Sequence, residues 1–352
     1  MNMPSKQICR KAAATSCMVD GAIVLYETSA ESETSLSSLK VPVRIRSRRR
    51  RTRDSVSKLA FRVNYLRRSR EIYRRYLESK PWINQLYQTF LNIMPGQKIV
   101  EVGCGPGDFS RHLARLSNQK ATVLGIDSNP KSIQAATVDT RKARLSRSVS
   151  YKLGDVYKLP LEEGYADLTC CRTLLMHLTE PLKAVKEMAR VTKNGGSVVA
   201  VEGGKMSAFY DPDDERYSNL AEHAQEAWIS GIRKLEGKEF RIGEKLPGVF
   251  RKAGLSNIKA EVQADSWLYS DPRRRLDDVK DELRFEYSIF KERKRKDRKY
   301  LLAGGMSNAQ ITSYYGRLED RTRKLLSSDE ELRNDASFYA ATFFLVSGMK
   351  KD

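Results

Sequence analysis

The chain has 352 residues, of which 40% are hydrophobic and 31% are charged, and both values are typical of a globular protein. No run of 18 or more apolar residues occurs, so we expect no membrane-spanning helix. The N-terminus lacks the apolar stretch of a secretory signal, so we expect a cytoplasmic protein. The spacing of the five cysteines and three histidines predicts neither a disulfide framework nor a metal site.

The formal net charge of +20 is concentrated in two segments. Residues 1–80 hold 19 Lys and Arg against 7 Asp and Glu, and residues 291–299 hold 7 against 2. The middle of the chain is nearly neutral. Charge of this kind bears on partners and solubility and not on the fold, so nucleic acid is a possible partner of the two basic segments alone.

The N-terminal region divides into two parts. Residues 1–55 show no sustained periodicity and are rich in Ser and Arg, which predicts a disordered basic tail. Residues 56–95 carry a helical pattern, and Pro81 suits the first turn of its second helix. We therefore expect an N-terminal helical extension in front of the first strand.

Residues 96–204 alternate between short apolar runs and amphipathic segments. This alternation predicts a parallel sheet covered by helices on both faces, with right-handed crossovers. We therefore predict an α/β, doubly wound, Rossmann-like fold. The expected strands are Lys98–Val102, Thr122–Asp127, Val149–Leu153, Ala166–Cys171 and Ser197–Glu202, and the expected helices are Phe109–Leu116, Pro130–Lys142 and Pro181–Val191.

The pattern changes after residue 204. Residues 205–255 are mainly helical and amphipathic, which predicts a lid. Residues 256–352 predict two last strands, Ile258–Val262 and Phe338–Ser347, separated by a charged helical insertion at residues 272–335.

A glycine-rich turn follows the first strand of the core. The segment VEVGCGPG ends a strand in Glu101 and turns through Gly103, Cys104, Gly105 and Gly107, where the backbone can bend tightly and approach a ligand closely. The dinucleotide pattern G-x-G-x-x-G requires a final glycine where this chain has an aspartate. A carboxylate beside a pyrophosphate would be unfavourable, whereas it would favour a ligand with an ammonium and a sulfonium. The turn therefore favours S-adenosylmethionine over NAD.

Two more acidic residues follow neighbouring strands. Asp127, followed by Ser128, ends the second strand, where a carboxylate can accept hydrogen bonds from both ribose hydroxyls. Asp155, followed by Val156, comes after the third strand, where a carboxylate can accept a hydrogen bond from the exocyclic amine of adenine. Ligands of open α/β sheets bind at the carboxyl ends of strands, so the acids together predict one cofactor site.

Residues 97–202 resemble the class I S-adenosylmethionine-dependent methyltransferases, in particular the type 11 group that contains the ubiquinone and menaquinone C-methyltransferases. The matching segments are VEVGCGPG, GIDSNP, LGDVYKLPLEEGYAD and LLMHLTEPLKAVKEMARVTKNGGSVV. The resemblance implies a seven-stranded, mostly parallel sheet with strand order 3-2-1-4-5-7-6, whose last strand is antiparallel to the others.

The same resemblance assigns residues to parts of the cofactor. It implies that Asp127 holds the ribose and Asp155 the adenine. The residues that it places around the methionine part are Glu101, Gly103 and Gly105, and those that it places facing the cofactor or the acceptor are Arg172 and Thr173.

Catalytic residues are only weakly indicated. Methyl transfer from a sulfonium is an in-line displacement that needs alignment and exclusion of water, without a covalent enzyme intermediate. His177 follows the fourth strand, where a general base could reach an acceptor, and it also has a purely structural interpretation. Tyr210 and Glu202 border the expected acceptor side.

The sequence predicts a methyltransferase with a small-molecule or lipid-like acceptor. The core is nearly neutral, and the segment CRTLLMHL lacks the Asn/Asp-Pro-Pro-Tyr/Phe motif of enzymes that methylate base amines. The alternative is an RNA or protein methyltransferase that binds through the basic tail and Lys291–Lys299. A third hypothesis is a basic interaction protein that keeps the fold without turnover.

Overall fold

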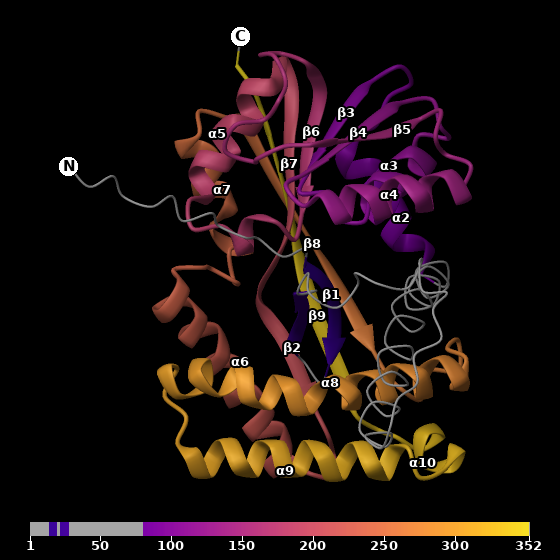
Figure 1. The fold of residues 1–352 in the computed structure, drawn as a ribbon, viewed down its shortest axis with the longest axis vertical. Helices are drawn as coiled ribbons and strands as arrows, with labels where there is room; N and C mark the ends of the chain where they lie inside the picture. The colour runs from indigo at the N-terminus through magenta and orange to yellow at the C-terminus, as the bar shows by residue number, and fades with distance from the viewer. Residues whose placement is uncertain (1–13, 20–21, 28–79, 352) are drawn as a thin grey trace, which may run out of the picture.

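The computed structural model describes residues 14–19, 22–27 and 80–351 (Figure 1). The strands in this part of the chain are β1 (Ala14–Val19), β2 (Ala22–Glu27), β3 (Lys98–Val102), β4 (Thr122–Asp127), β5 (Val149–Leu153), β6 (Ala166–Arg172), β7 (Thr192–Tyr210), β8 (Ser256–Trp267) and β9 (Phe338–Met349). The α-helices are α2 (Pro81–Leu91), α3 (Asp108–Leu116), α4 (Pro130–Lys142), α5 (Pro181–Val191), α6 (Glu215–Glu236), α7 (Leu246–Lys252), α8 (Leu276–Ala303), α9 (Asn308–Leu325) and α10 (Asp329–Arg333). The short 3-10 helices are η1 (Leu175–His177) and η2 (Gly243–Lys245).

The main sheet has seven strands in the order β5-β4-β3-β6-β7-β9-β8. The strands from β3 to β7 are parallel to one another, and β9 is antiparallel to both β7 and β8. This is the order 3-2-1-4-5-7-6 with one reversed strand, so the predicted doubly wound α/β fold is confirmed.

Helices cover both faces of the sheet at one end of the molecule (Figure 1). On one face α2 and α3 pack through Tyr87, Phe109 and Leu113, and on the other α5 and α7 pack through Met188 and Phe250. Burial of each side chain of this size stabilises the fold by about 1.5–3 kcal/mol. The core strands can therefore be apolar on both faces, and their carboxyl ends are held along one rigid edge.

β7, β8 and β9 continue beyond this covered part as an arm (Figure 1). β7 passes a register irregularity between Gly203 and Ser207 and then pairs with β9 as far as Tyr210. The expectation of a helical segment from residue 205 is wrong for residues 205–210, because β9 offers β7 a continuous edge to pair with. The arm therefore reaches farther than the predicted strand Ser197–Glu202.

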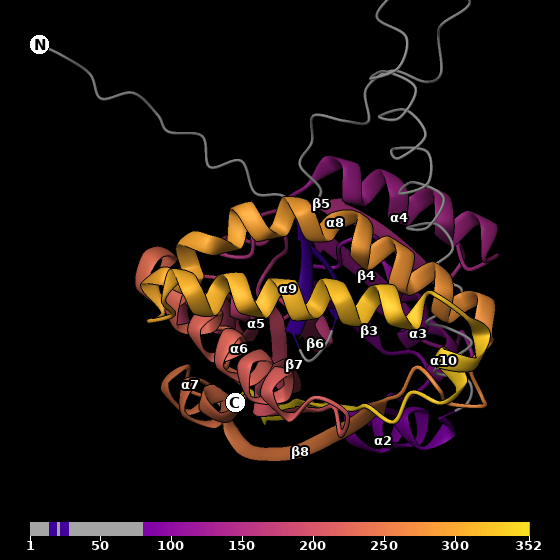
Figure 2. The ribbon, with the colours of Figure 1, turned by 90° about the horizontal axis from the view of Figure 1, so that it is seen from below.

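At the far end of the arm α6, α8 and α9 form a layer that we call the helical base (Figures 1 and 2). α6 and α8 are in backbone contact, since a Cβ added at Gly231 or at Gly304 would collide with backbone atoms of the other helix. The ring of Tyr217 packs against those of Phe209 and Tyr314. The segment expected to form a lid thus supplies one helix of the base.

Arg321 of α9 joins the base to the ends of the arm strands. Its side chain is 8% exposed and pairs with Asp211, just beyond β7, at 2.9 Å and with Asp335, just before β9, at 3.1 Å. Its guanidinium also lies 5.7 Å from the ring centroid of Tyr269, just beyond β8. One buried arginine thus connects segments that are far apart in the sequence.

The N-terminal region is described only in part. β1 and β2 pair antiparallel within residues 1–55, for which we predicted disorder. The rest of that stretch and the helical pattern of residues 56–79 lie outside the described residues. α2 begins at Pro81 as expected, and the buried Lys80 before it pairs with Asp265 of β8. Within the described ranges no helix is long and apolar enough to cross a membrane.

Candidate cofactor and acceptor site

The loop between β3 and α3 lies at the carboxyl edge of the sheet. Gly103, Gly105 and Gly107 have φ values of 71°, 50° and 78°, which side-chain-bearing residues rarely adopt. The backbone amides of Gly103 and Cys104 donate to the carbonyl of Ile126 at 2.7 and 3.0 Å. The glycines thus bend the chain where the sequence predicted a tight turn, and the turn is fastened to the end of β4.

The three glycines differ in their surroundings. A Cβ added at Gly103 would lie 2.5 Å from Leu174 Cδ1, and one added at Gly107 would collide with the hydroxyl of Tyr151. A Cβ added at Gly105 would meet no atom within 4 Å among the residues that the structure describes. Packing requires glycine at the first and last positions, whereas the space above Gly105 is open to a ligand.

Glu101 ends β3 directly before this loop. Its side chain is buried, and the hydroxyl of Ser110 in α3 donates to Oε2. Burial raises the pKa of Glu101 to about 8, although the Ser110 hydrogen bond and the charge of Arg172 act in the opposite direction. The hydrogen bond and the nearby charge replace only part of the hydration that the carboxyl loses on burial. A cationic group beside the ionised carboxyl would therefore be strongly stabilised. This environment fits the ammonium of a methionine moiety.

Arg172 ends β6, the strand beside β3. Its guanidinium lies 5.8 Å from the ring centroid of Phe109 and 5.7 Å from that of Phe343. These contacts connect α3 with β9 across the carboxyl edge. They also keep the positive charge near Glu101, where it offsets part of the rise in pKa that burial causes. The structure therefore places Arg172 beside the glycine loop.

Asp127 ends β4 and contacts the same loop. Its Oδ2 accepts a hydrogen bond from the Gly105 amide at 2.9 Å, and its Oδ1 accepts one from the Asn129 amide at 2.8 Å. Burial raises the pKa of Asp127, and the two amide hydrogen bonds lower it. Each oxygen retains a further lone pair, so the fixed carboxylate fits a ribose diol.

Asp155 lies in the turn after β5. It is exposed, and its Oδ1 accepts a hydrogen bond from the Tyr157 amide at 2.9 Å. The adjacent Val156 is buried in the core, whereas Ser128, one residue beyond Asp127, is exposed. An exposed carboxyl at this position fits an amine at the open end of a ligand.

The three acids follow one another along the edge. Glu101, Asp127 and Asp155 belong to β3, to β4 and to the turn after β5, which are neighbours in the sheet. Adjacent strands lie about 4.8 Å apart, so the row spans about 10 Å. An extended ligand can therefore present an ammonium, a diol and an amine to the three carboxyls in that order.

A second buried carboxyl holds the loop after β6. The Oε1 of Glu202, which is 0% exposed, accepts hydrogen bonds from the amides of Leu174 at 2.9 Å and Leu175 at 2.7 Å, and its Oε2 accepts one from Met176 at 3.4 Å. Burial raises the pKa of Glu202 to about 7. Thr173 has a φ of 48°, which is uncommon for a β-branched residue and persists only where the surroundings impose it.

This role of Glu202 was missed by the sequence analysis, which placed it only at the border of the acceptor side. The signal was present, because Glu202 is an acid near the end of an apolar strand, as Glu101 is. What the sequence does not contain is the path of the loop that brings three amides to the carboxyl. Ser110 and Tyr151, which contact Glu101 and the glycine loop, carried no signal of their own.

His177 belongs to an aromatic cluster beside the same loop. The ring of Phe240 packs edge-on against His177 at 5.3 Å and against Trp228 of α6 at 5.2 Å between centroids. His177 Nε2 and Trp228 Nε1 are buried, and neither has a hydrogen-bond partner in the described part of the chain. Burial lowers the pKa of His177 to about 4, so its imidazole is neutral at pH 7.

Two other candidates have different surroundings. Tyr210 is the last residue of β7, roughly 26 Å along the strand from Glu202, and its side chain is exposed at the far end of the arm. The structure therefore does not bring Tyr210 to the cofactor edge. Cys104 is buried in the glycine loop, and burial raises the pKa of its thiol far above the ordinary value.

Comparison with known proteins matches the same part of the chain. Residues 100–200 match the type 11 family described as "Methyltransferase domain". The chain is 32% identical over 159 residues to cycloartenol-C-24-methyltransferase of Arabidopsis thaliana, over 45% of this chain and 42% of that protein. It is 27% identical over 129 residues to ubiquinone/menaquinone biosynthesis C-methyltransferase UbiE of Vibrio vulnificus, over 37% of this chain and 49% of that protein.

Among solved structures, a putative methyltransferase from Bacillus halodurans aligns over 76% of this chain and 99% of its own, with 12% identity and a TM-score of 0.47. The chain spans less than two thirds of the length of the curated relatives named above. The segment matched by the family includes the glycine loop and the three strand ends that carry the acids. The chain thus carries, at residues 100–200, a segment that is similar to the type 11 family of class I S-adenosylmethionine-dependent methyltransferases.

Proposed function

We propose that the protein transfers a methyl group from S-adenosylmethionine to a small-molecule or lipid-like acceptor by in-line displacement. The observation that carries this proposal is the row of carboxyls Glu101, Asp127 and Asp155 along the carboxyl edge. When bound, the cofactor supplies an electrophilic methyl group on its sulfonium. The chain has to hold that group in line with the acceptor and exclude water.

The surroundings of each carboxyl determine its task in this proposal. Glu101 pairs with the ammonium of the methionine part, because its burial is only partly offset by the Ser110 hydrogen bond and the charge of Arg172. Asp127 is already oriented by two backbone amides, so it accepts the ribose hydroxyls with little rearrangement. Asp155 lies exposed at the end of the row and accepts the adenine amine. Glu202 keeps the loop after β6 in place on the acceptor side.

The acceptor side favours a ligand that is largely apolar. The loop after β6 is backed by the apolar cluster of His177, Phe240 and Trp228, in which two buried ring nitrogens have no partner in the described ranges. The neutral imidazole of His177 can form a hydrogen bond with the acceptor, whereas its lowered pKa disfavours uptake of a proton. The match to a protein named for methylation of cycloartenol at C-24 supports a lipid-like acceptor.

Product binding tests the cofactor part of this proposal. We expect S-adenosylhomocysteine to raise the unfolding temperature, because a ligand at about 100 times its dissociation constant stabilises the native state by about 2.7 kcal/mol. NAD at the same concentration should produce no shift. A shift with NAD, or none with millimolar S-adenosylhomocysteine, would contradict the assignment of the cofactor.

Transfer of a labelled methyl group tests the acceptor part. The protein would be incubated with methyl-labelled S-adenosylmethionine and, separately, with organic-soluble extract, RNA and protein. We expect the label in the organic-soluble fraction. Label confined to RNA or protein would replace the proposed acceptor class.

The second candidate function is methylation of RNA or protein. One observation favours it, namely that Lys294, Arg295 and Lys296 are exposed on α8. Phosphate contacts by such cations give a salt dependence with a logarithmic slope of about −0.7 to −0.9 per contact. RNA binding that is weak and insensitive to salt would exclude this candidate.

A further inference from the structure

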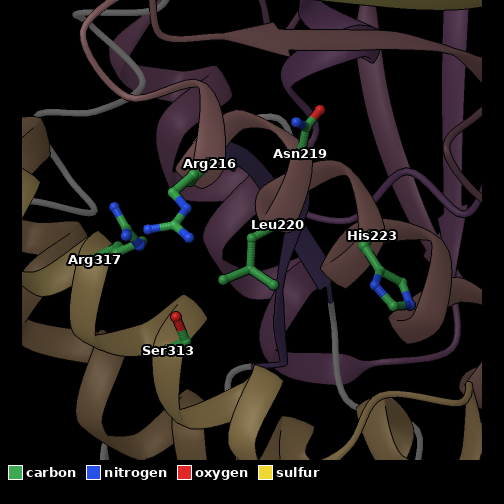
Figure 3. A pocket seen from close by; sticks show the side chains of 6 residues that line it. All are labelled: Arg216, Asn219, Leu220, His223, Ser313 and Arg317. Atoms are coloured by element: carbon green, nitrogen blue, oxygen red, sulfur yellow. The ribbon is translucent and has the colours of Figure 1, made fainter.

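A groove lies between α6 and α9 on the helical base, at the far end of the arm from the glycine loop (Figure 3). Its volume is about 530 Å³. The residues that line it are Arg216, Asn219, Leu220 and His223 of α6, and Ser313 and Arg317 of α9. A volume of this size lies within the range of small-molecule sites, about 300–1,000 Å³.

The groove carries positive charge that is only partly compensated. Figure 3 shows the guanidinium groups of Arg216 and Arg317 directed toward one another from the two helices. Arg317 pairs with Asp214 Oδ2 at 2.5 Å, whereas no ion pair or hydrogen bond of the Arg216 side chain occurs among the described residues. None of the six lining residues is acidic. Like charges that line one groove repel each other, and an anion bound between them would reduce the repulsion.

The remaining polar side chains of the groove are also available to a ligand. Those of Asn219, His223 and Ser313 form no hydrogen bond within the part of the chain that the structure describes. They offer an amide, an imidazole and a hydroxyl, each of which can donate a hydrogen bond. Arg216 lies in the first turn of α6, and the acids of that turn, the N-cap Asp214 and Glu215, are not among the lining residues. The wall therefore has many donors and no carboxylate.

We propose that this groove binds the phosphate group of a phosphomonoester. A guanidinium can bind two phosphate oxygens through parallel hydrogen bonds. Arg216 offers a positive charge that no described carboxylate compensates, and Arg317 shares its charge between Asp214 and the phosphate. Asn219 and Ser313 complete the hydrogen bonds to the phosphate. The volume exceeds what the phosphate needs, so part of the organic moiety lies over Leu220, the one apolar lining residue. The phosphomonoester is either a free metabolite or the headgroup of a membrane lipid.

The test uses the 352-residue chain and two variants that each remove one positive charge. Arg216→Ala removes a groove contact, and Arg251→Ala removes an exposed arginine of α7 as a matched control. Binding of inorganic phosphate and of glycerol 3-phosphate is measured by calorimetry. Binding to phosphatidylcholine vesicles with and without phosphatidic acid is measured by flotation. We expect Arg216→Ala to weaken phosphate binding by at least about tenfold and the control to leave it unchanged.

The outcomes separate the two sources of the phosphate. Binding to phosphatidic acid vesicles that Arg216→Ala weakens identifies a lipid headgroup, and binding of glycerol 3-phosphate without vesicle binding identifies a free metabolite. The proposal would be overturned if the unaltered chain bound no phosphate. It would also be overturned if Arg216→Ala and Arg251→Ala bound phosphate with equal affinity. Preferential binding of RNA in the groove would overturn it as well. Affinity for S-adenosylhomocysteine is measured in parallel and should stay unchanged, so this result does not depend on the methyl-transfer proposal.

Discussion

The carboxyl edge and the helical base bury charge in different ways. At the edge, Glu101 and Glu202 are buried carboxyls whose pKa values burial raises, and neither forms an ion pair in the described part of the chain. At the base, Arg321 is almost as deeply buried and pairs with both Asp211 and Asp335. Ionisable groups with strongly shifted pKa values gather at functional sites, whereas fully paired charges hold segments together. On this difference we propose that the edge binds ligand and that Arg321 maintains the architecture.

The largest expected effect comes from Arg321→Ala at the base. It leaves two buried aspartates without their partner, so we expect the free energy of unfolding to fall by about 3–5 kcal/mol. Denaturant unfolding measures this loss, and S-adenosylhomocysteine titration of the folded fraction should show unchanged affinity. Arg323→Ala, in the same helix with its side chain 61% exposed, is the control and should change stability little. Equal losses in the two variants would remove the architectural role of Arg321.

Asp127→Ala should have the largest effect on binding at the edge. It removes a charged acceptor from two ribose hydroxyls, and each such hydrogen bond contributes about 1.5–3 kcal/mol. We expect the affinity for S-adenosylhomocysteine to fall by at least about 100-fold, as measured by calorimetry, with the fold intact. Asp320→Ala, which removes a 77% exposed carboxyl from α9, should leave the affinity unchanged. An unaltered affinity in Asp127→Ala would refute the ribose assignment.

The pKa of Glu101 predicts a pH dependence of binding. Below its pKa of about 8 the carboxyl is largely protonated, and an ammonium beside it favours the ionised form, so binding releases a proton. The affinity for S-adenosylhomocysteine should therefore rise with pH, by up to about tenfold per unit between about pH 6 and 7.5. Glu101→Gln should remove most of this slope. The same slope in wild type and variant would contradict the pairing of Glu101 with the ammonium.

The raised pKa of Glu101 also predicts how the stability of the unliganded protein depends on pH. The pKa of Glu101 in the folded state lies above the ordinary glutamate value of 4.5, so the folded state binds the extra proton. The free energy of unfolding should therefore decrease as the pH rises from 4.5 toward 8, and Glu101→Gln should flatten this decrease. Denaturant unfolding across this pH range measures both curves.

Gly105→Ala should have the smallest effect on stability. It should nevertheless weaken the binding of S-adenosylhomocysteine clearly. A left-handed backbone costs a side-chain-bearing residue about 1–2 kcal/mol, and the added Cβ occupies the open space above the loop. Gly96→Ala is the control. Gly96 also has a positive φ, of 82°, and free space for a Cβ, but it lies in the turn before β3. Both variants should lose similar stability, and Gly105→Ala alone should lose affinity for S-adenosylhomocysteine. A similar affinity loss in both would show that the space above Gly105 is not used.

The core was predictable because its signals are local. α4 begins at Pro130, where the Asn129 side chain accepts a hydrogen bond from the Lys131 amide, and α5 begins at Pro181. Caps and prolines of this kind fix helix starts without help from the rest of the fold. The reach of β7 to Tyr210 was not predictable, because its partner β9 lies more than a hundred residues later in the chain.

The sequence alone determined the doubly wound core and the placement of Glu101, Asp127 and Asp155 at successive strand ends, since glycine conformation and strand periodicity follow from local residue patterns. The strand order came from the resemblance to the type 11 methyltransferases. Only the tertiary structure decided three other features. They are the hydrogen bonds from the loop after β6 to Glu202, the connection of the arm to the base through Arg321, and the groove between α6 and α9. Each depends on which distant segments come into contact. Such contacts are set by the packing of whole elements, and no local pattern in the sequence encodes them.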